Sequence, residues 1–247
     1  MRSIKNIIGY TLRATDGEIG KIHDFYFDDE RWTIRYLIVN TEGMLVHHEV
    51  LISPVVLQNP EWDNKILPVS ITRKKVERSP EKQAHQPVSR RKELDLAKYY
   101  TWPAYWAWSG MSAPIDAAAI AKSIEQATEQ DEKEDDDLHL RSIREVSGYN
   151  IRATDESIGH VEDFIVDVET WVLRYLIIDT RNWLPGGKKV LISPMWAKNV
   201  DWGEKMVHLD LPSDKIKESP EFDPSEPVKR EYEELLHDFY KKQKYWL

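Results

Sequence analysis

The chain has 247 residues, a formal net charge of −9 and no cysteine. Its length allows two small domains, each large enough to bury its own core. The acidic balance argues against broad binding of nucleic acid, which requires clustered Lys and Arg, and the lack of cysteine excludes disulfides, thiol catalysis and cysteine-bound metal clusters.

The sequence contains the same domain twice. The segment GYTLRATDGEIGKIHDFYFDDERWTIRYLIVNT at 9–41 returns as GYNIRATDESIGHVEDFIVDVETWVLRYLIIDT at 148–180, and VLISP at 50–54 returns at 190–194. A repeat of this length predicts two copies of one structural unit. Residues kept in both copies then indicate what the fold needs, and residues present in one copy are candidates for specialised work.

The first copy begins with two strands joined by a tight turn. Thr15 to Gly17 predicts that turn, because an Asp-Gly pair readily supplies the positive φ that a hairpin requires. In the strand that follows, Ile22 has the opposite parity to Phe25 and Phe27. Since alternate residues of a strand face opposite sides, we expect a bulge near Asp24.

Five segments of copy one, rich in β-branched and aromatic residues, read as short strands. They are residues 8–14, 19–27, 32–40, 46–53 and 66–71. Strands of this number and length predict a small antiparallel barrel or a strongly curled sheet in each copy. We expect a short helix at 72–77 and its counterpart at 213–218.

Each copy is followed by a tail that begins as a charged amphipathic helix and ends in aromatic residues. The tails cover residues 87–108 and 227–247, and each contains a Tyr-Trp pair. The distance from the preceding Ser-Pro to this pair is the same in both, although the residues between them differ. We therefore expect the tail ends to dock, with Trp106 and Trp246 in equivalent places.

The segment between the repeats is Ala-rich and then acidic. We interpret residues 109–140 as a linker with one helix at 115–127 and a solvated acidic stretch at 129–137. The predicted domains are therefore 1–108, a barrel-like domain with its tail, and 141–247, a second one with its tail.

The repeated residues resemble the PRC-barrel family. The resemblance rests on the GY, RATD, IG and DF residues, followed by Trp, RYLI and LISP, and it covers most of 1–80 and 140–220. It implies a small, strongly bent β barrel that serves as a docking module on a larger assembly. The family includes the cytoplasmic domain of the photosynthetic reaction-centre H subunit, but stand-alone bacterial members are the better match, because this sequence lacks that subunit's membrane helix.

Repeated charged residues near the hairpins are candidates for catalysis or for structure. Asp24, Asp28 and Arg35 recur as Asp163, Asp167 and Arg174. Carboxylates next to an arginine could act as acid and base, but around a hairpin they more readily form cross-strand ion pairs and turn contacts. We expect the structural role.

His47-His48-Glu49 is the closest match to a metal site, since imidazole and carboxylate bind zinc. Neighbouring strand residues point to opposite faces, and copy two has Gly187-Lys188-Lys189 in this place. We expect no metal and no other cofactor. The sequence shows no nucleophile elbow, phosphate-binding glycine loop or dinucleotide fingerprint, so we expect no catalytic residues.

The aromatic residues of the tails allow two interpretations. They could stack a planar ligand or anchor a partner, or they could pack against the barrels. Packing is favoured, because so much exposed apolar surface would threaten solubility. The candidates for structural or interface roles are Asp24, Arg35, Trp102, Trp106, Asp163, Arg174 and Trp246.

The sequence thus predicts a mainly β protein of two PRC-type barrels that acts as a non-catalytic scaffold or adaptor for an unidentified protein partner. Two copies in one chain predict a pseudo-dimer within the chain, and a homodimer of the whole chain is a further option. The N-terminus lacks the apolar region of a signal peptide, and no stretch approaches the roughly 20 apolar residues of a membrane helix. We expect a cytoplasmic location, with the surface of the inner membrane as the other option. The alternative functions are a peripheral accessory of an electron-transfer complex, as the H subunit implies, and an enzyme, for which fold analogy offers no site.

Overall fold

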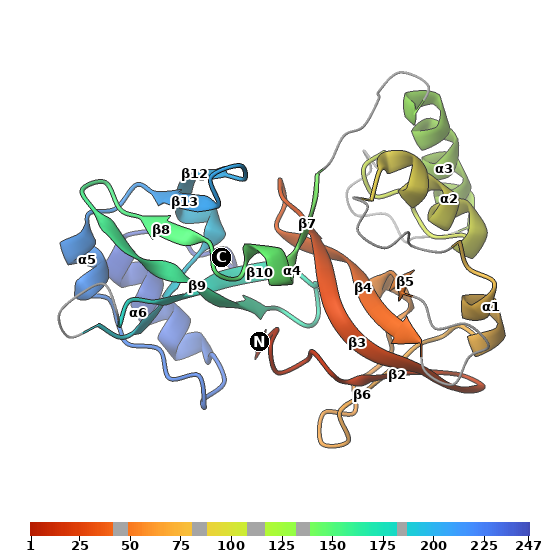
Figure 1. The fold of residues 1–247 in the computed structure, drawn as a ribbon, viewed down its shortest axis with the longest axis horizontal. Helices are drawn as coiled ribbons and strands as arrows, with labels where there is room; N and C mark the ends of the chain where they lie inside the picture. Colours follow the sequence, from red (N-terminus) through yellow and green to blue (C-terminus); the bar gives the residue numbers. More distant parts are fainter. Residues whose placement is uncertain (42–48, 81–87, 108–116, 132–138, 182–186) are drawn as a thin grey trace. The chain divides into compact units, whose positions relative to one another are not determined.

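The computed structural model describes residues 1–41, 49–80, 88–107, 117–131, 139–181 and 187–247. The described residues form a mainly β structure with two sheets (Figure 1). The chain divides into two compact units. The C-terminal unit contains Met1–Ile8, Asp29–Ile34 and Arg141–Leu247, and the N-terminal unit contains Gly9–Asp28 and Arg35–Leu140.

This division differs from the expected one because two pieces of copy one fold with copy two. The strand β1 (Arg2–Ser3) pairs with β9 (Ser157–Val166) in antiparallel register. In Asp29–Ile34, the backbone carbonyl of Trp32 accepts a hydrogen bond of 2.7 Å from the backbone N–H of Leu173. Both pieces therefore complete the C-terminal unit.

The elements of the first copy follow the expected order. They are β2 (Thr11–Ala14), β3 (Gly17–Asp28), β4 (Thr33–Thr41), β5 (Glu49–Ile52), the 3-10 helix η1 (Pro54–Val56), β6 (Ile66–Pro68), α1 (Arg73–Glu77), α2 (Arg90–Tyr100) and α3 (Ala117–Asp131). The sheet has the order β5-β4-β3-β2-β6. The short helix predicted at 72–77 is confirmed as α1, whose first turn is capped by the Thr72 side chain.

The second copy repeats the order of these strands and adds one strand at the edge of its sheet. After β7 (Leu140–Ser142) and α4 (Ile143–Val146) come β8 (Asn150–Arg152), β9, β10 (Leu173–Asp179), β11 (Lys189–Ile192), the 3-10 helix η2 (Pro194–Trp196), β12 (Ala197–Asp201), β13 (Met206–Leu209), α5 (Ser213–Lys217) and α6 (Arg230–Tyr240). The sheet has the order β11-β10-β9-β8-β13-β12, with β1 paired to β9. The predicted helix at 213–218 is confirmed as α5.

The sheets differ from the predicted antiparallel barrels in two respects, the direction of one strand pair in each sheet and the lack of closure. β2 pairs in parallel with β6, where Thr11 lies opposite Ile66, and β8 pairs in parallel with β13, where Asn150 lies opposite Met206. Parallel pairing is possible because the chain passes through the rest of the sheet before it returns, whereas a tight hairpin can join only antiparallel strands. Within the described residues neither sheet closes into a barrel.

The bulge near Asp24 stays a prediction in copy one, but a bulge is present at the equivalent place in copy two. The register of the β9–β10 pairing shifts at Glu162, directly before Asp163, the counterpart of Asp24. Val161 and Phe164 lie three residues apart and are both fully buried. The extra residue in β9 makes this burial possible, because it changes which face the following side chains reach.

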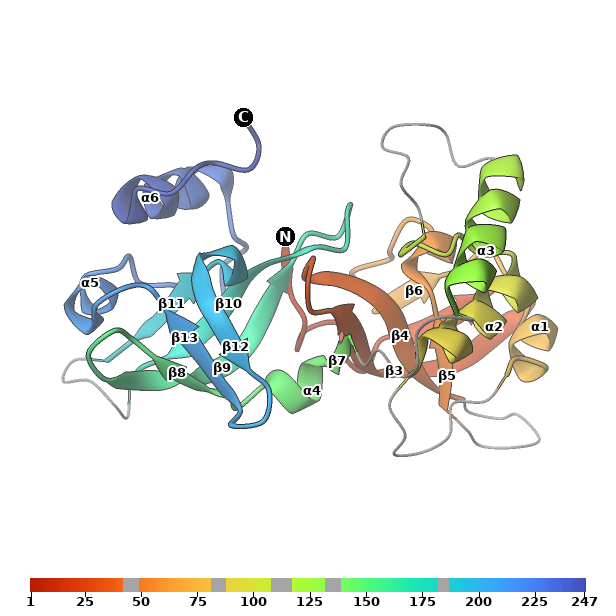
Figure 2. The same cartoon turned by 90° about the horizontal axis from the view of Figure 1, so that it is seen from above.

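The helices after each sheet are packed rather than free. In the N-terminal unit, Leu94 of α2 forms a buried cluster with two tail residues, Ala104 and Ala107, and with Ala127 on α3. The helix predicted within the linker therefore belongs to this unit, and α2 and α3 lie side by side in both views (Figures 1 and 2). In the C-terminal unit, α6 covers one face of the sheet (Figure 2).

Candidate functional site

A buried polar network joins the tail to the sheet in the C-terminal unit. Glu233 on α6 accepts hydrogen bonds at Oε1 from the hydroxyls of Tyr175 on β10, at 2.9 Å, and Tyr245 in the tail, at 2.8 Å. The Oε2 atom lies 2.8 Å from Nη1 of Arg230. Burial, followed by the charge of Glu233, raises the pKa of Tyr175 far above its usual range. The glutamate thus holds a strand, a helix and the tail together.

The same network recurs in the N-terminal unit. The Tyr105 hydroxyl donates to Oε1 of Glu93 at 2.9 Å, and Nη1 of Arg90 lies 3.2 Å from Oε2. Tyr36, the counterpart of Tyr175, is buried, and burial followed by the Glu93 charge raises its pKa well above the usual value. Both tails are therefore fixed by the same residue types.

An imidazole completes each network, but it comes from a different part of the chain. In the C-terminal unit, Nε2 of His237 lies 3.0 Å from the Tyr175 hydroxyl oxygen. The aligned residue in copy one is Ala97. There His139 supplies the imidazole, with Nε2 at 2.9 Å from the hydroxyl oxygen of Tyr105. Two histidines without a common sequence position thus join the networks, His237 through the strand tyrosine and His139 through the tail tyrosine.

The predicted arginines connect these networks to the hairpins. Nη2 of Arg35 lies 3.2 Å from Oδ2 of Asp28, and Arg174 lies at the same distance from Asp167. The guanidinium groups also lie over tail rings, at 3.8 Å for Arg35 over Tyr105 and 4.0 Å in the counterpart pair of Arg174 and Tyr245. These cation–π contacts add to the docking of the tails.

Trp106 and Trp246 occupy equivalent places. The guanidinium of Arg90 lies 5.0 Å from the Trp106 ring, and that of Arg230 lies 4.3 Å from the Trp246 ring. Trp246 is only half-buried, so it contributes less apolar burial than a core residue. Trp102 is buried and stacks on its neighbour Tyr100, with ring centroids 4.0 Å apart.

Two other predicted residues, Asp24 and Asp163, are both buried. Their hydrogen bonds described here are to backbone N–H groups and a serine hydroxyl. The carboxylate of Asp163 accepts hydrogen bonds from the Ser3 hydroxyl and, at 3.2 Å, from the backbone N–H of Lys5. Burial raises the pKa of Asp163. In the N-terminal unit, Oδ1 of Asp24 accepts from the backbone N–H of Phe25 at 2.8 Å. Asp163 therefore fastens the N-terminal segment.

The networks contain groups that catalyse acid–base reactions elsewhere, but here these groups are buried. Glu93, Glu233, His139 and His237 are each less than 5% exposed. Their hydrogen-bonding capacity is used by neighbouring side chains and backbone. Sequence reasoning missed these residues, although Arg-x-x-Glu stands at the same offset in both tails, at 90–93 and 230–233.

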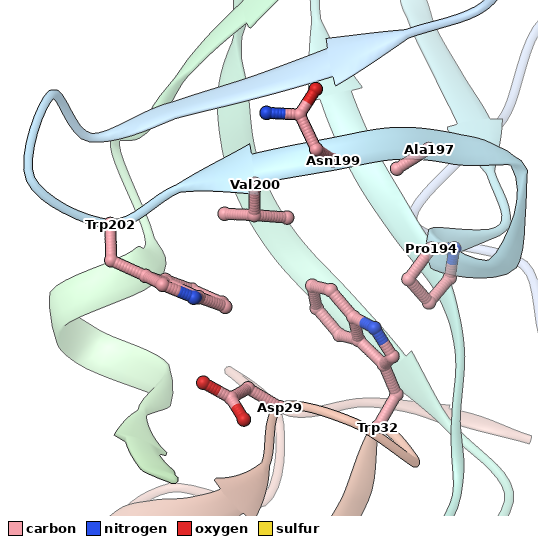
Figure 3. A pocket seen from close by; sticks show the side chains of 7 residues that line it. All are labelled: Asp29, Trp32, Pro194, Ala197, Asn199, Val200 and Trp202. Carbon is pink, nitrogen blue, oxygen red and sulfur yellow. The ribbon is translucent and has the colours of Figure 1, made fainter. Parts of the chain in front are cut away.

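A separate pocket lies within the C-terminal unit (Figure 3). We call it the tryptophan pocket; it has a volume of about 260 Å³ and is lined by Asp29, Trp32, Pro194, Ala197, Asn199, Val200 and Trp202. The rings of Trp32 and Trp202 have centroids 6.4 Å apart and are tilted by 37°. Sequence reasoning did not identify this pocket, because Asp29 and Trp32 come from copy one and the remaining residues from copy two.

The prediction that His47-His48-Glu49 binds no metal is not tested, because His47 and His48 lie outside the described residues. Glu49, the third residue of that cluster, has Oε1 at 4.0 Å from Nε2 of His23. Within the part of the chain that the structure describes, no three His, Asp or Glu side chains are grouped to hold a metal ion.

We expect His237 to make the stability depend on pH. Burial lowers the pKa of its imidazole below the usual 6.5, so the unfolded chain binds this proton more readily than the folded chain. The stabilisation is therefore complete above pH 6.5 and is lost as the pH falls through the lowered value. Urea unfolding between about pH 7.5 and 5 should show a falling free energy of unfolding. His237→Ala should flatten that fall, and an unchanged slope would contradict the assignment.

Comparison with known proteins identifies one domain. The PRC-barrel domain family matches residues 139–216, so a PRC-barrel domain is present in the second copy. No curated protein matches the chain. Among the described helices, none combines the length and apolar character needed to cross a bilayer.

Proposed function

We propose that this chain, with a PRC-barrel domain at residues 139–216, is a non-catalytic scaffold or adaptor that binds another protein through surfaces of both copies. We further propose that the first copy is a second PRC-type module. The shared strand order and the parallel β2–β6 and β8–β13 pairs support this view. The matching networks around Glu93 and Glu233 support it as well.

The observation that carries the docking proposal is an exposed apolar residue at the same corner of each copy. Val55 in η1 is 56% exposed and Met195 in η2 is 72% exposed. Each backbone N–H is held at 3.4 Å by the preceding serine hydroxyl, from Ser53 and Ser193. A single exposed apolar residue is ordinary. Its repetition on two rigid, identically capped turns favours a surface that a partner covers.

The closed networks also favour an adaptor over an enzyme. Their carboxylates, imidazoles and tyrosine hydroxyls are buried and fix the tails, so their chemistry is used for structure. A docking module requires such rigidity, because a preorganised surface loses less conformational entropy when it binds.

Cross-linking with mass spectrometry in native extract tests this function. We expect a protein cross-linked near Val55 or Met195 in the wild-type chain to be lost in Val55→Lys and Met195→Lys. Leu235→Lys is the matched control, since Leu235 is 55% exposed but lies on α6. Survival of the cross-links in both variants would reject the proposal. Cross-links to a chromophore-containing membrane complex would instead favour an accessory role like that of the reaction-centre H subunit.

A further inference from the structure

We propose that a helical face of the first copy docks on the equivalent helical face of the second copy in another chain, so that the protein associates head to tail with itself. The partner at this surface is therefore a second copy of this chain. The proposal is separate from the adaptor function, because Val55 and Met195 lie on the 3-10 helices η1 and η2, outside both faces. It rests on the equivalent construction of the two faces and on their opposite charges.

The helices that form the two faces are equivalent. α1 and α2 begin and end at residues that align with the ends of α5 and α6. In the N-terminal unit, the Tyr99 hydroxyl on α2 donates a hydrogen bond of 2.7 Å to the backbone carbonyl of Lys75 on α1. In the C-terminal unit, Nζ of Lys215, the counterpart of Lys75, lies 3.8 Å from the ring centre of Phe239, the counterpart of Tyr99. The two helices therefore meet at aligned residues and form one surface in each unit.

The exposed charges of these helices reverse sign between the copies. The basic helix face of copy one consists of four exposed residues, Lys74, Arg78, Arg91 and Lys98. The acidic helix face of copy two consists of the four residues aligned with them, Asp214, Glu218, Glu231 and Asp238, which are also exposed. Surfaces of opposite potential attract each other and fix the orientation in which they meet. The two faces are therefore electrostatically complementary.

The basic helix face keeps its sign when its acidic neighbours are included. Glu77 and Asp95 are exposed on the same two helices. Nε of Arg73 lies 3.2 Å from Oε1 of Glu77, so this carboxylate is balanced within α1. Asp95 is then outnumbered by the four basic residues of the face.

The carboxylates of the acidic helix face remain open to a partner. Oδ1 of Asp214 lies 3.3 Å from Nζ of Lys217, and Oδ1 of Asp238 lies 2.9 Å from Nζ of Lys244. The side chains of Asp214 and Asp238 are nevertheless 86% and 68% exposed. Exposed ion pairs contribute little to stability, so a cationic group of another chain can take the place of Lys217 or Lys244 at low cost.

An apolar side chain in the acidic helix face also suits a basic partner. Leu235 is 55% exposed and lies about one helical turn from both Glu231 and Asp238 on α6. Arginine and lysine cover apolar surface with their aliphatic stems while their charged ends reach nearby carboxylates. Arg91 and Lys98 have the same spacing on α2 as Glu231 and Asp238 have on α6. The basic helix face therefore offers both the charges and the aliphatic stems that this surface requires.

Every chain carries one face of each kind, so association can continue from chain to chain or close into a ring. We expect weak binding, with Kd of about 10–500 μM, because exposed charge pairs each contribute little. Assembly should therefore depend on protein concentration and on salt.

Sedimentation velocity of the full chain at about 5–300 μM tests the proposal. The average mass should rise with concentration at about 20 mM salt and stay near that of one chain at about 500 mM, because salt screens exposed charges. Arg91→Glu with Lys98→Asp removes the basic helix face, and Glu231→Arg with Asp238→Lys removes the acidic one. Each of these double variants alone should associate at least about tenfold more weakly than the wild type.

Mixing the two double variants is the decisive measurement, because one keeps the acidic helix face and the other keeps the basic one. The mixture should associate at low salt although neither variant does so alone, a result that misfolded variants would not give. The control is Lys65→Glu with Lys205→Glu, in exposed turns before β6 and β13. It changes the net charge as much as Arg91→Glu with Lys98→Asp and should associate as the wild type does.

The proposal is overturned if the wild type keeps the mass of one chain at every concentration in low salt. It is also overturned if both double variants associate as the wild type does, or if their mixture does not associate. Vesicles of phosphatidylcholine and phosphatidylglycerol test a lipid surface as the occupant. Binding of a monomeric wild type to these vesicles, lost in Arg91→Glu with Lys98→Asp, would assign the basic helix face to anionic lipid and overturn the proposal as well.

Discussion

Replacing Glu233 with alanine should lower the free energy of unfolding by about 3 kcal/mol, because a buried acceptor shared by several donors is lost. The hydroxyls of Tyr175 and Tyr245 and the guanidinium of Arg230 all bond to this carboxylate. Tyr175 is fully buried and would have no water to replace the lost acceptor. The change also leaves a cavity beneath the tail.

Urea unfolding followed by circular dichroism measures this effect. The control is Glu234→Ala, since Glu234 is the next residue of α6 and is exposed; its cost should stay within about 0.5 kcal/mol. Equal unfolding midpoints for the two variants would show that the network does not stabilise the fold. Glu93→Ala should repeat the result in the N-terminal unit, where the contacts of Glu93 are equivalent.

The sequence predicted those features that rest on local pattern. Alternating apolar residues located the strands. The parity change at Ile22 and Phe25 predicted a bulge near Asp24, and the structure shows a bulge at the equivalent place in copy two, at Glu162. The equal spacing to Trp106 and Trp246 predicted equivalent positions, which the arginine contacts display. In these cases the same pattern occurs in both copies of the sequence, so each prediction could be made twice.

The sequence could not predict features that depend on residues brought together from distant segments. The imidazole of the network comes from position 139 in one unit and from position 237 in the other. These positions are not aligned in the two copies, so a comparison of the copies does not identify either histidine. The pairing of β1 with β9 joins residues about 160 positions apart without a local signal. The tryptophan pocket escaped notice for the same reason, since Asp29 meets Trp202 only after folding.

Asp163→Ala should detach the N-terminal segment Met1–Ile8 and cost about 2–3 kcal/mol. The buried carboxylate accepts hydrogen bonds from the Ser3 hydroxyl and the Lys5 backbone. The backbone N–H of Ile4 donates to Phe164 at 2.9 Å, and the Ile4 side chain is fully buried. Loss of the aspartate therefore leaves unsatisfied donors at the point where this segment enters the sheet.

Hydrogen exchange at the Ile4 and Lys5 amides measures the release directly. Both should exchange faster in Asp163→Ala, whereas Asp214→Ala should not change them, since that side chain is 86% exposed. Asp163→Asn should be milder, because burial raises the pKa of Asp163, which means that the charged form is disfavoured there. A double-mutant cycle with Ser3→Ala should give a coupling energy of at least about 0.5 kcal/mol. A coupling near zero, with unchanged exchange at Ile4, would show that β1 is held by its strand pairing and apolar burial without help from Asp163.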